Sequence, residues 1–122
     1  MTEKDADIFL LSLAGITKDY KEEWGWHRYL LNEKMVAAIC RDKAGELILT
    51  VKCEPSFGAH LREVYEDVIP GYYMNKTHWN SVKLKRNVPS EVIKAMISQS
   101  YELIYRSFSR KIQSEIEKAE DA

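Results

Sequence analysis

The chain has 122 residues, of which 45% are hydrophobic and 30% charged, the size and composition of one soluble domain with its own core. Its formal net charge of −1 excludes the strongly basic composition of many DNA-binding domains, so any affinity for nucleic acid must come from a local patch. The polar residues 1–7 do not resemble a signal peptide, and no apolar run is long enough to span a membrane. Because Cys40 and Cys53 do not make a disulfide framework, we expect a cytoplasmic protein with reduced thiols.

The first half of the chain predicts one helix followed by strands. Residues 3–14 favour a helix, because acids occupy its first turns and Gly15 is a natural stop. Residues 16–27 mix charged and aromatic side chains, and they predict a short strand or an irregular segment that packs Trp24 or Trp26 against the sheet edge. Strands with tight turns between them are expected over residues 28–31, 34–41 and 46–54.

Alternation in the third of these strands separates two faces of the predicted sheet. One face, directed at the core, carries Leu47, Leu49, Val51 and Cys53. The other face is expected to be more open, and it carries Ile48, Thr50 and Lys52.

The second half predicts a helix, a strand and a long final helix. Pro55 suits the first turn of a helix that reaches about Glu66, and residues 79–85 alternate as a strand. The final helix begins at Pro89 or Ser90 and carries a regular apolar stripe. We expect it to continue past Lys111, because neither Gly nor Pro interrupts it.

The C-terminal residues extend this stripe beyond the expected domain. We expect residues 1–111 to form a single domain and residues 112–122 to form a charged helical extension or a frayed tail. Either the stripe pairs with another chain, or the helix bends over the edge of the sheet, so a monomer and a weak dimer both remain open. The stripe residues in question are Tyr105, Phe108, Ile112 and Ile116.

The order of elements is α-β-β-β-α-β-β-α, if one strand is counted near Ile69 or in the stretch that follows it. This order predicts an α+β domain of two layers, in which the helices cover one face of an antiparallel sheet.

The stretch from Pro70 to Val82 is unusually rich in large amphipathic side chains, and it holds no acidic residue. Its sequence, Pro-Gly-Tyr-Tyr-Met-Asn-Lys-Thr-His-Trp-Asn-Ser-Val, resembles the signature of the MmcQ/YjbR family, small bacterial proteins usually described as DNA-binding. The family's usual Gly before Lys34 is replaced here by Glu33. Further matches lie at Lys52–Pro55, Arg62, Val88-Pro89 and Ser100–Leu103.

The resemblance implies an α+β fold whose outer face has been compared with a "double wing" nucleic-acid-binding motif. Between Gly71 and Ser90 the chain carries four cations and no acid. Cations that neutralise phosphates beside aromatics that stack on bases would suit nucleic acid, whereas the plainer interpretation is a solvated sheet face. The predicted DNA- or RNA-binding residues are Lys34, Lys52, Tyr73, Asn75, Lys76, His78, Trp79, Lys83, Lys85 and Arg86.

Within this set, Asn75 is expected to shape the loop through bonds to its own backbone, while His78 suits contact or architecture equally. A nucleophilic cysteine enzyme is disfavoured, because Cys53 falls on the apolar face of its strand. The histidines and cysteines lack the paired spacing of zinc sites, and no cofactor fingerprint occurs. We therefore expect no enzymatic activity, no metal and no cofactor, and the alternative to nucleic-acid binding is a chaperone-like protein-interaction module.

Overall fold

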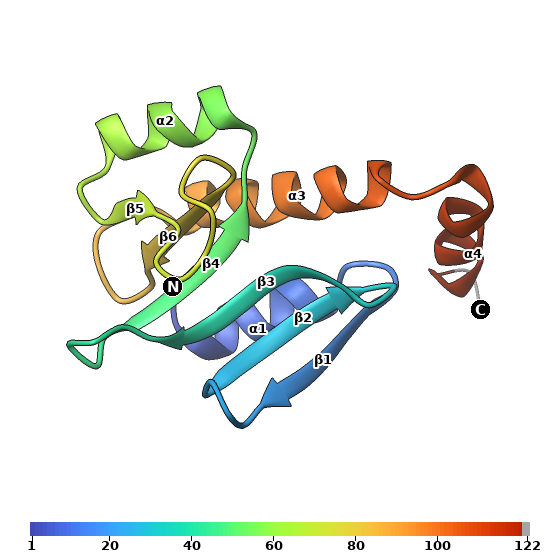
Figure 1. Ribbon diagram of the computed structural model, residues 1–122, viewed down its shortest axis with the longest axis horizontal. Coiled ribbons are helices and arrows are strands. Elements are labelled where there is room, and N and C mark those ends of the chain that lie inside the picture. The colour runs from blue at the N-terminus through green and yellow to red at the C-terminus, as the bar shows by residue number, and fades with distance from the viewer. Residues whose placement is uncertain (121–122) are drawn as a thin grey trace.

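The structure, a computed structural model, describes residues 1–120 (Figure 1). Its helices are α1 (Glu3–Leu11), α2 (Pro55–Val64), α3 (Ser90–Arg106) and α4 (Arg110–Glu120). Its strands are β1 (Ile16–Lys21), β2 (Trp26–Leu31), β3 (Lys34–Arg41), β4 (Leu47–Lys52), β5 (Val68–Pro70) and β6 (Trp79–Lys83).

The six strands form one antiparallel sheet in the order β1-β2-β3-β4-β6-β5. The predicted tight turn joins β2 to β3, where Asn32 and Glu33 adopt φ angles of 46° and 70°. Two successive residues with positive φ match the right-handed twist of a hairpin, so this turn fits the sheet although neither residue is glycine. The predicted α+β class with an antiparallel sheet is confirmed.

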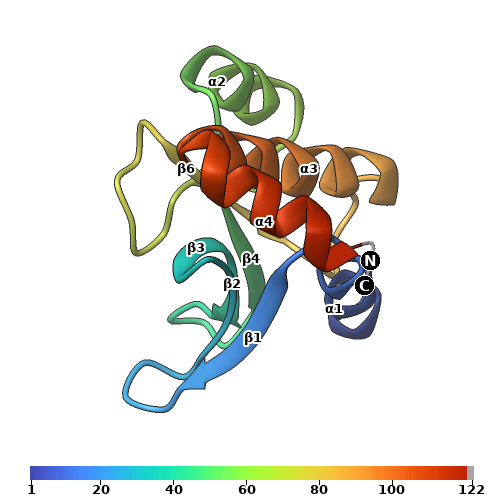
Figure 2. The ribbon, with the colours of Figure 1, turned by 90° about the vertical axis from the view of Figure 1, so that its right-hand side faces the viewer.

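One face of the sheet carries the main core, which the helices cover. Figure 2 shows α1, α3 and α4 on one side of the sheet, while the β1–β2 turn and the loop before β6 project on the other. The core face alternates as predicted for β4, because an antiparallel register places side chains of paired strands on the same face. Its fully buried members include Tyr29, Ala37, Ile39, Leu49, Val51 and Val82, which pack with Ile93 and Ile97 of α3.

The segment from residue 16 to residue 27, for which a short strand or an irregular segment was predicted, forms regular strands. It forms β1, a four-residue turn and the start of β2, because cross-strand side chains reinforce the pairing. Arg28 donates two hydrogen bonds to the Asp19 carboxylate, at 2.8 and 2.5 Å. The rings of Tyr20 and His27 lie 4.7 Å apart.

The final helix does not continue past Lys111 as predicted. It ends at Arg106, where the Ser107 hydroxyl bonds to the Ile104 carbonyl, and α4 starts at Arg110 after a short break. Serine breaks the helix here because its hydroxyl competes for backbone groups.

The break lets α4 fold back on its own chain. Ile116 is buried against Leu31, and Gln113 donates hydrogen bonds to the carbonyls of Tyr105 and Phe108. The predicted extension or frayed tail covered residues 112–122; the chain is helical up to Glu120, and residues 121–122 lie outside the described residues. No helix within residues 1–120 is both long and apolar enough to cross a membrane.

A half-buried carboxylate links α1 to the sheet and gives a pH-dependent prediction. Asp7 accepts hydrogen bonds from Lys18 at 2.7 Å and from Tyr29 at 2.6 Å. Burial opposes ionisation, but these two bonds outweigh it and lower the pKa of Asp7. Because the folded pKa lies below the unfolded value of about 3.9, the stabilisation is present above that pH and is lost as the pH falls through the folded pKa.

Asp7→Asn is therefore expected to lower the free energy of unfolding by about 1 kcal/mol at neutral pH. The difference from the wild type should shrink steadily below roughly pH 4. Urea denaturation of both proteins across this range measures it, and a difference that does not change with pH would contradict the assignment.

Candidate functional site

The loop between β5 and β6, residues 71–78, has a fixed shape that its own side chains impose. The Gly71 amide donates a hydrogen bond of 2.6 Å to the Trp79 carbonyl, which closes the loop at its base. The Asn75 side-chain oxygen accepts from the amides of Thr77 and His78, at 2.9 and 3.2 Å, as an asparagine does in a tight loop. Lys76 donates to the Gly71 carbonyl at 3.1 Å. Hydrogen bonds within the loop therefore fix its conformation, and the Asn75 side chain supplies two of them.

This loop folds over the sheet face that is opposite the helices. The Tyr72 amide donates to the Ser81 hydroxyl at 3.0 Å, and that hydroxyl shares a hydrogen bond of 2.7 Å with Thr50. Tyr73 donates to the Arg41 carbonyl at 3.4 Å, which carries the loop across to the end of β3. Thr50 and Ser81 are buried, so the expectation of an open face is wrong for the middle of the sheet.

Beside the loop, four aromatic rings form a continuous chain. The ring centroids of Trp24 and Trp26 lie 5.1 Å apart, those of Trp26 and Tyr73 5.7 Å, and those of Tyr73 and Tyr72 4.6 Å. The chain thus joins the β1–β2 hairpin to the 71–78 loop. Such tilted and edge-on pairs are favourable arrangements for aromatic rings.

Three of these rings border a hollow of about 570 Å³, which we call the aromatic groove. It is lined by Trp24, Trp26, Met35, Tyr73 and Met74. Two of the lining side chains face solvent, since Trp24 is 56% and Tyr73 46% exposed. Of the five residues that line the groove, only Tyr73 was among the binding residues predicted from the sequence. The pair of tryptophans around Gly25 was the available signal, but the other lining residues come from β3 and the 71–78 loop, and spacing in the sequence could not assign them.

The predicted cations do not share one surface. Arg86 donates to both carboxylate oxygens of Glu46, and Lys83 lies 3.9 Å from the same group, so one acid 40 residues away offsets part of the predicted patch. The hydrogen bond from Arg86 lowers the pKa of Glu46, which keeps this acid ionised. Lys85 lies beside Lys18 at a hollow next to α1, on the helix side of the sheet.

Lys34 lies elsewhere again, at the junction of α3 and α4. Its ammonium group donates to the Ser107 hydroxyl at 3.2 Å and lies 4.8 Å from the centre of the Phe108 ring. Lys52 and Trp79 do meet as cross-strand partners, and both are half-buried. The structure therefore brings together the loop residues, Lys52 and Trp79, and separates Lys34 and Lys85 from them.

The histidine and cysteine side chains considered as site residues show no arrangement for catalysis or metal binding within the described part of the chain. His78 is exposed, and its carbonyl accepts a hydrogen bond of 2.8 Å from the Cys53 amide. Cys53 is buried, and burial raises the pKa of its thiol, as expected for a structural cysteine. Among the described residues, no group of three or more histidine, cysteine, aspartate or glutamate side chains is arranged to hold a metal ion.

Two bacterial proteins are similar to this chain in sequence. The chain is 32% identical to the uncharacterized protein YyaQ of Bacillus subtilis, over 77% of this chain and 98% of that protein. It is 27% identical to the uncharacterized protein YjbR of Escherichia coli K12, over 84% of this chain and 86% of that protein.

Two solved bacterial structures share the fold of this chain. The crystal structure of Deinococcus radiodurans protein DR2400 superposes with a TM-score of 0.83 and 25% identity, over 94% of this chain and 87% of that one. A protein from Pseudomonas syringae shares the fold, with a TM-score of 0.76 over 84% of this chain and 98% of its own. The sequence model of the YjbR family matches residues 11–103, and the chain belongs to this family.

Proposed function

We propose that the protein is a protein-interaction module that holds an apolar segment of a partner polypeptide in the aromatic groove. The observation that carries the proposal is the groove itself, in which three aromatic rings and two methionines surround one hollow at the surface. Aromatic anchors dominate the energetics of protein interfaces, and methionine adapts its shape to different apolar partners. Large exposed aromatic side chains that gather in one place are typical of such interfaces.

The charges around the groove favour a polypeptide over a nucleic acid. Trp24 follows two exposed acids, Glu22 and Glu23, on the β1–β2 turn. One cation is close by, because the Lys21 ammonium group lies 3.6 Å from the Glu23 carboxylate and 5.3 Å from the centre of the Trp24 ring. The two acids outnumber this one cation, so the carboxylates of Glu22 and Glu23 disfavour a phosphate backbone beside Trp24. A segment with an apolar centre and basic flanks complements them, so we infer a partner of this chemistry.

We further propose that the module has no enzymatic activity and works in the cytoplasm. Support comes from Cys53, whose buried thiol is poorly suited to act as a nucleophile. Cys40 is also buried, and both cysteines are free, as expected for a protein kept in a reducing compartment.

The test measures the binding of three labelled probes by fluorescence anisotropy. The probes are a short leucine- and phenylalanine-rich peptide flanked by lysines, the same peptide flanked by glutamates, and a short single-stranded DNA. We expect the lysine-flanked peptide to bind most tightly. Trp24→Ala and Tyr73→Ala should each weaken its binding by roughly tenfold or more, the loss typical of a central aromatic anchor.

Val64→Ala is the matched control, because Val64 is an exposed apolar side chain, 54% accessible, on α2 away from the groove. It should leave binding unchanged. Tight binding of the DNA alone, with a steep loss as salt rises and with the peptides unbound, would reject the proposal in favour of nucleic-acid binding through Lys52, Lys76 and Trp79. Equal binding by Trp24→Ala and the wild type would reject the groove as the site.

A further inference from the structure

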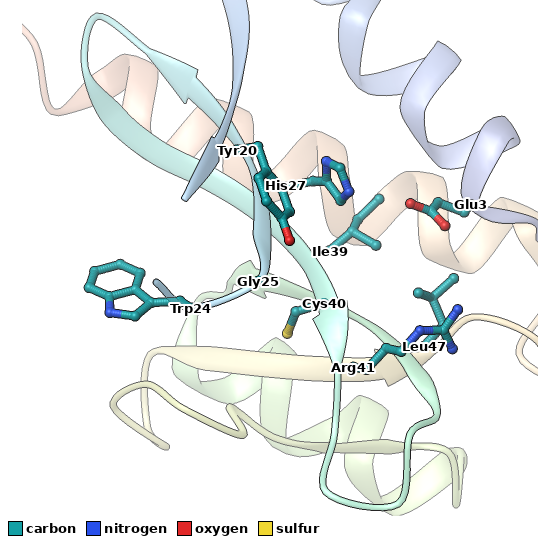
Figure 3. A pocket seen from close by; sticks show the side chains of 9 residues that line it. All are labelled: Glu3, Tyr20, Trp24, Gly25, His27, Ile39, Cys40, Arg41 and Leu47. Carbon is teal, nitrogen blue, oxygen red and sulfur yellow. The ribbon is translucent and has the colours of Figure 1, made fainter. Parts of the chain in front are cut away.

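A second hollow lies at the end of the sheet, between the first turn of α1 and the β1–β2 hairpin (Figure 3). Its volume is about 410 Å³, within the roughly 300–1,000 Å³ typical of small-ligand pockets. We call it the α1–β3 pocket, and define it by six of its lining residues: Glu3, Tyr20, His27, Ile39, Arg41 and Leu47. They come from α1 and four strands, so only the folded chain assembles them.

Opposite charges border this pocket without neutralising each other. Glu3 supplies a carboxylate from α1, and Arg41 supplies a guanidinium group from the end of β3 (Figure 3). Within residues 1–120, neither side chain takes part in an ion pair. One nitrogen of the exposed Arg41 donates a hydrogen bond of 2.8 Å to the Gly45 carbonyl, which orients the group without supplying a carboxylate partner.

The helix turn that carries Glu3 is held in place before any ligand arrives. Thr2 and Asp5 form a reciprocal capping box, with bonds of 3.2 and 3.0 Å between each amide and the other side chain. The Met1 amino group donates to the Leu84 carbonyl at 3.2 Å, which ties the N-terminus to the chain that follows β6. Fixed positions reduce the ordering cost of binding.

The rest of the pocket suits a small molecule with a polar head and an apolar body. Tyr20 and His27 lie ring to ring, and they offer a hydroxyl and an imidazole for hydrogen bonds. Ile39 and Leu47 are buried, and they supply the apolar part of the pocket lining.

We propose that the α1–β3 pocket binds a small zwitterion of the amino-acid type, whose ammonium group faces Glu3 and whose carboxylate faces Arg41. A simple anion would leave Glu3 unpaired, and a simple amine would leave Arg41 unpaired. Only a ligand that carries both charges satisfies both sides of the pocket, while its side chain rests on Ile39 and Leu47. Trp24 lines both this pocket and the aromatic groove, but neither Glu3 nor Arg41 lines the groove, so variants of these two residues test the pocket separately.

The test follows amide chemical shifts of the full chain, tagged at the C-terminus to leave α1 free, during titration with L-leucine. Two analogues separate the charges: isocaproate lacks the amine, and isoamylamine lacks the carboxylate. We expect saturable shifts at the pocket residues with leucine and weaker binding of both analogues. Glu3→Gln should weaken leucine at least tenfold and leave isocaproate unchanged, whereas Arg41→Gln should weaken leucine at least tenfold and leave isoamylamine unchanged.

Glu63→Gln, an exposed acid on α2, is the control and should bind leucine as the wild type does. Glu3→Asp keeps the charge but shortens its reach, so an intermediate loss is expected and the result does not depend on how Glu3→Gln folds. The proposal is wrong if neither leucine nor any other common L-amino acid shifts the pocket amides. It is equally wrong if Glu3→Gln and Arg41→Gln, with spectra that otherwise overlay the wild type, bind leucine unchanged.

Discussion

Ser100→Ala is expected to lower the free energy of unfolding by about 2–4 kcal/mol, because it leaves one buried and one partly buried backbone group without a partner. The Ser100 hydroxyl donates to the Val36 carbonyl at 2.6 Å and accepts from the Lys52 amide at 3.0 Å. Val36 is the residue skipped in the pairing of β3 with β2, where the register shifts. The hydroxyl of α3 therefore completes the ladder of β3 and β4 at its last position.

Urea denaturation measures this loss. We expect the midpoint of the transition to fall while the dependence of the free energy of unfolding on urea concentration stays unchanged. Ser98→Ala is the matched control, since Ser98 is exposed on the same helix and alanine is the better helix former. It should change stability by less than about 0.5 kcal/mol. A Ser100→Ala protein as stable as this control would show that the two backbone groups find other partners.

Gly71→Ala is expected to cost about 2–3 kcal/mol and to detach the 71–78 loop from the sheet. A Cβ atom at this position would lie 2.7 Å from the Trp79 Cβ and 3.0 Å from the Trp79 carbonyl oxygen. These atoms belong to a strand and cannot move aside cheaply, so the closing bond between Gly71 and Trp79 must lengthen. Tyr73 would then lose its position in the aromatic groove.

Hydrogen exchange separates local detachment from global unfolding. The amides of Gly71 and Cys53, which bond to Trp79 and His78, should exchange much faster in Gly71→Ala than in the wild type, whereas core amides of β4 should follow global stability. Peptide binding in the groove should weaken together with this local change. Thr77→Ala, an exposed change in the same loop, should alter neither, and unchanged Gly71 exchange in Gly71→Ala would contradict the predicted clash.

Local patterns in the chain were sufficient to predict the class of the fold. The alternation of β4, the turn at Asn32 and Glu33, and Pro55 at the start of α2 all act through neighbours in sequence. The 70–82 stretch identified the family for the same reason, because Gly71 and Asn75 shape a loop through bonds within it. Asn75 therefore fulfilled its expected structural role.

The surfaces that carry the proposals depend on tertiary structure, because contacts between distant residues create them. The Glu46 carboxylate offsets the charge of Arg86 only because the β3–β4 turn meets the chain after β6. A stretch of sequence without acidic residues therefore has an acidic residue beside it in the folded protein. Trp24 and Tyr73 border one groove only because the 71–78 loop crosses the sheet. Likewise, the break after Arg106 contains no glycine or proline, and the burial of Ile116 in the folded-back chain stabilises it. Periodicity reports which residues are apolar, but only packing decides which partners they meet.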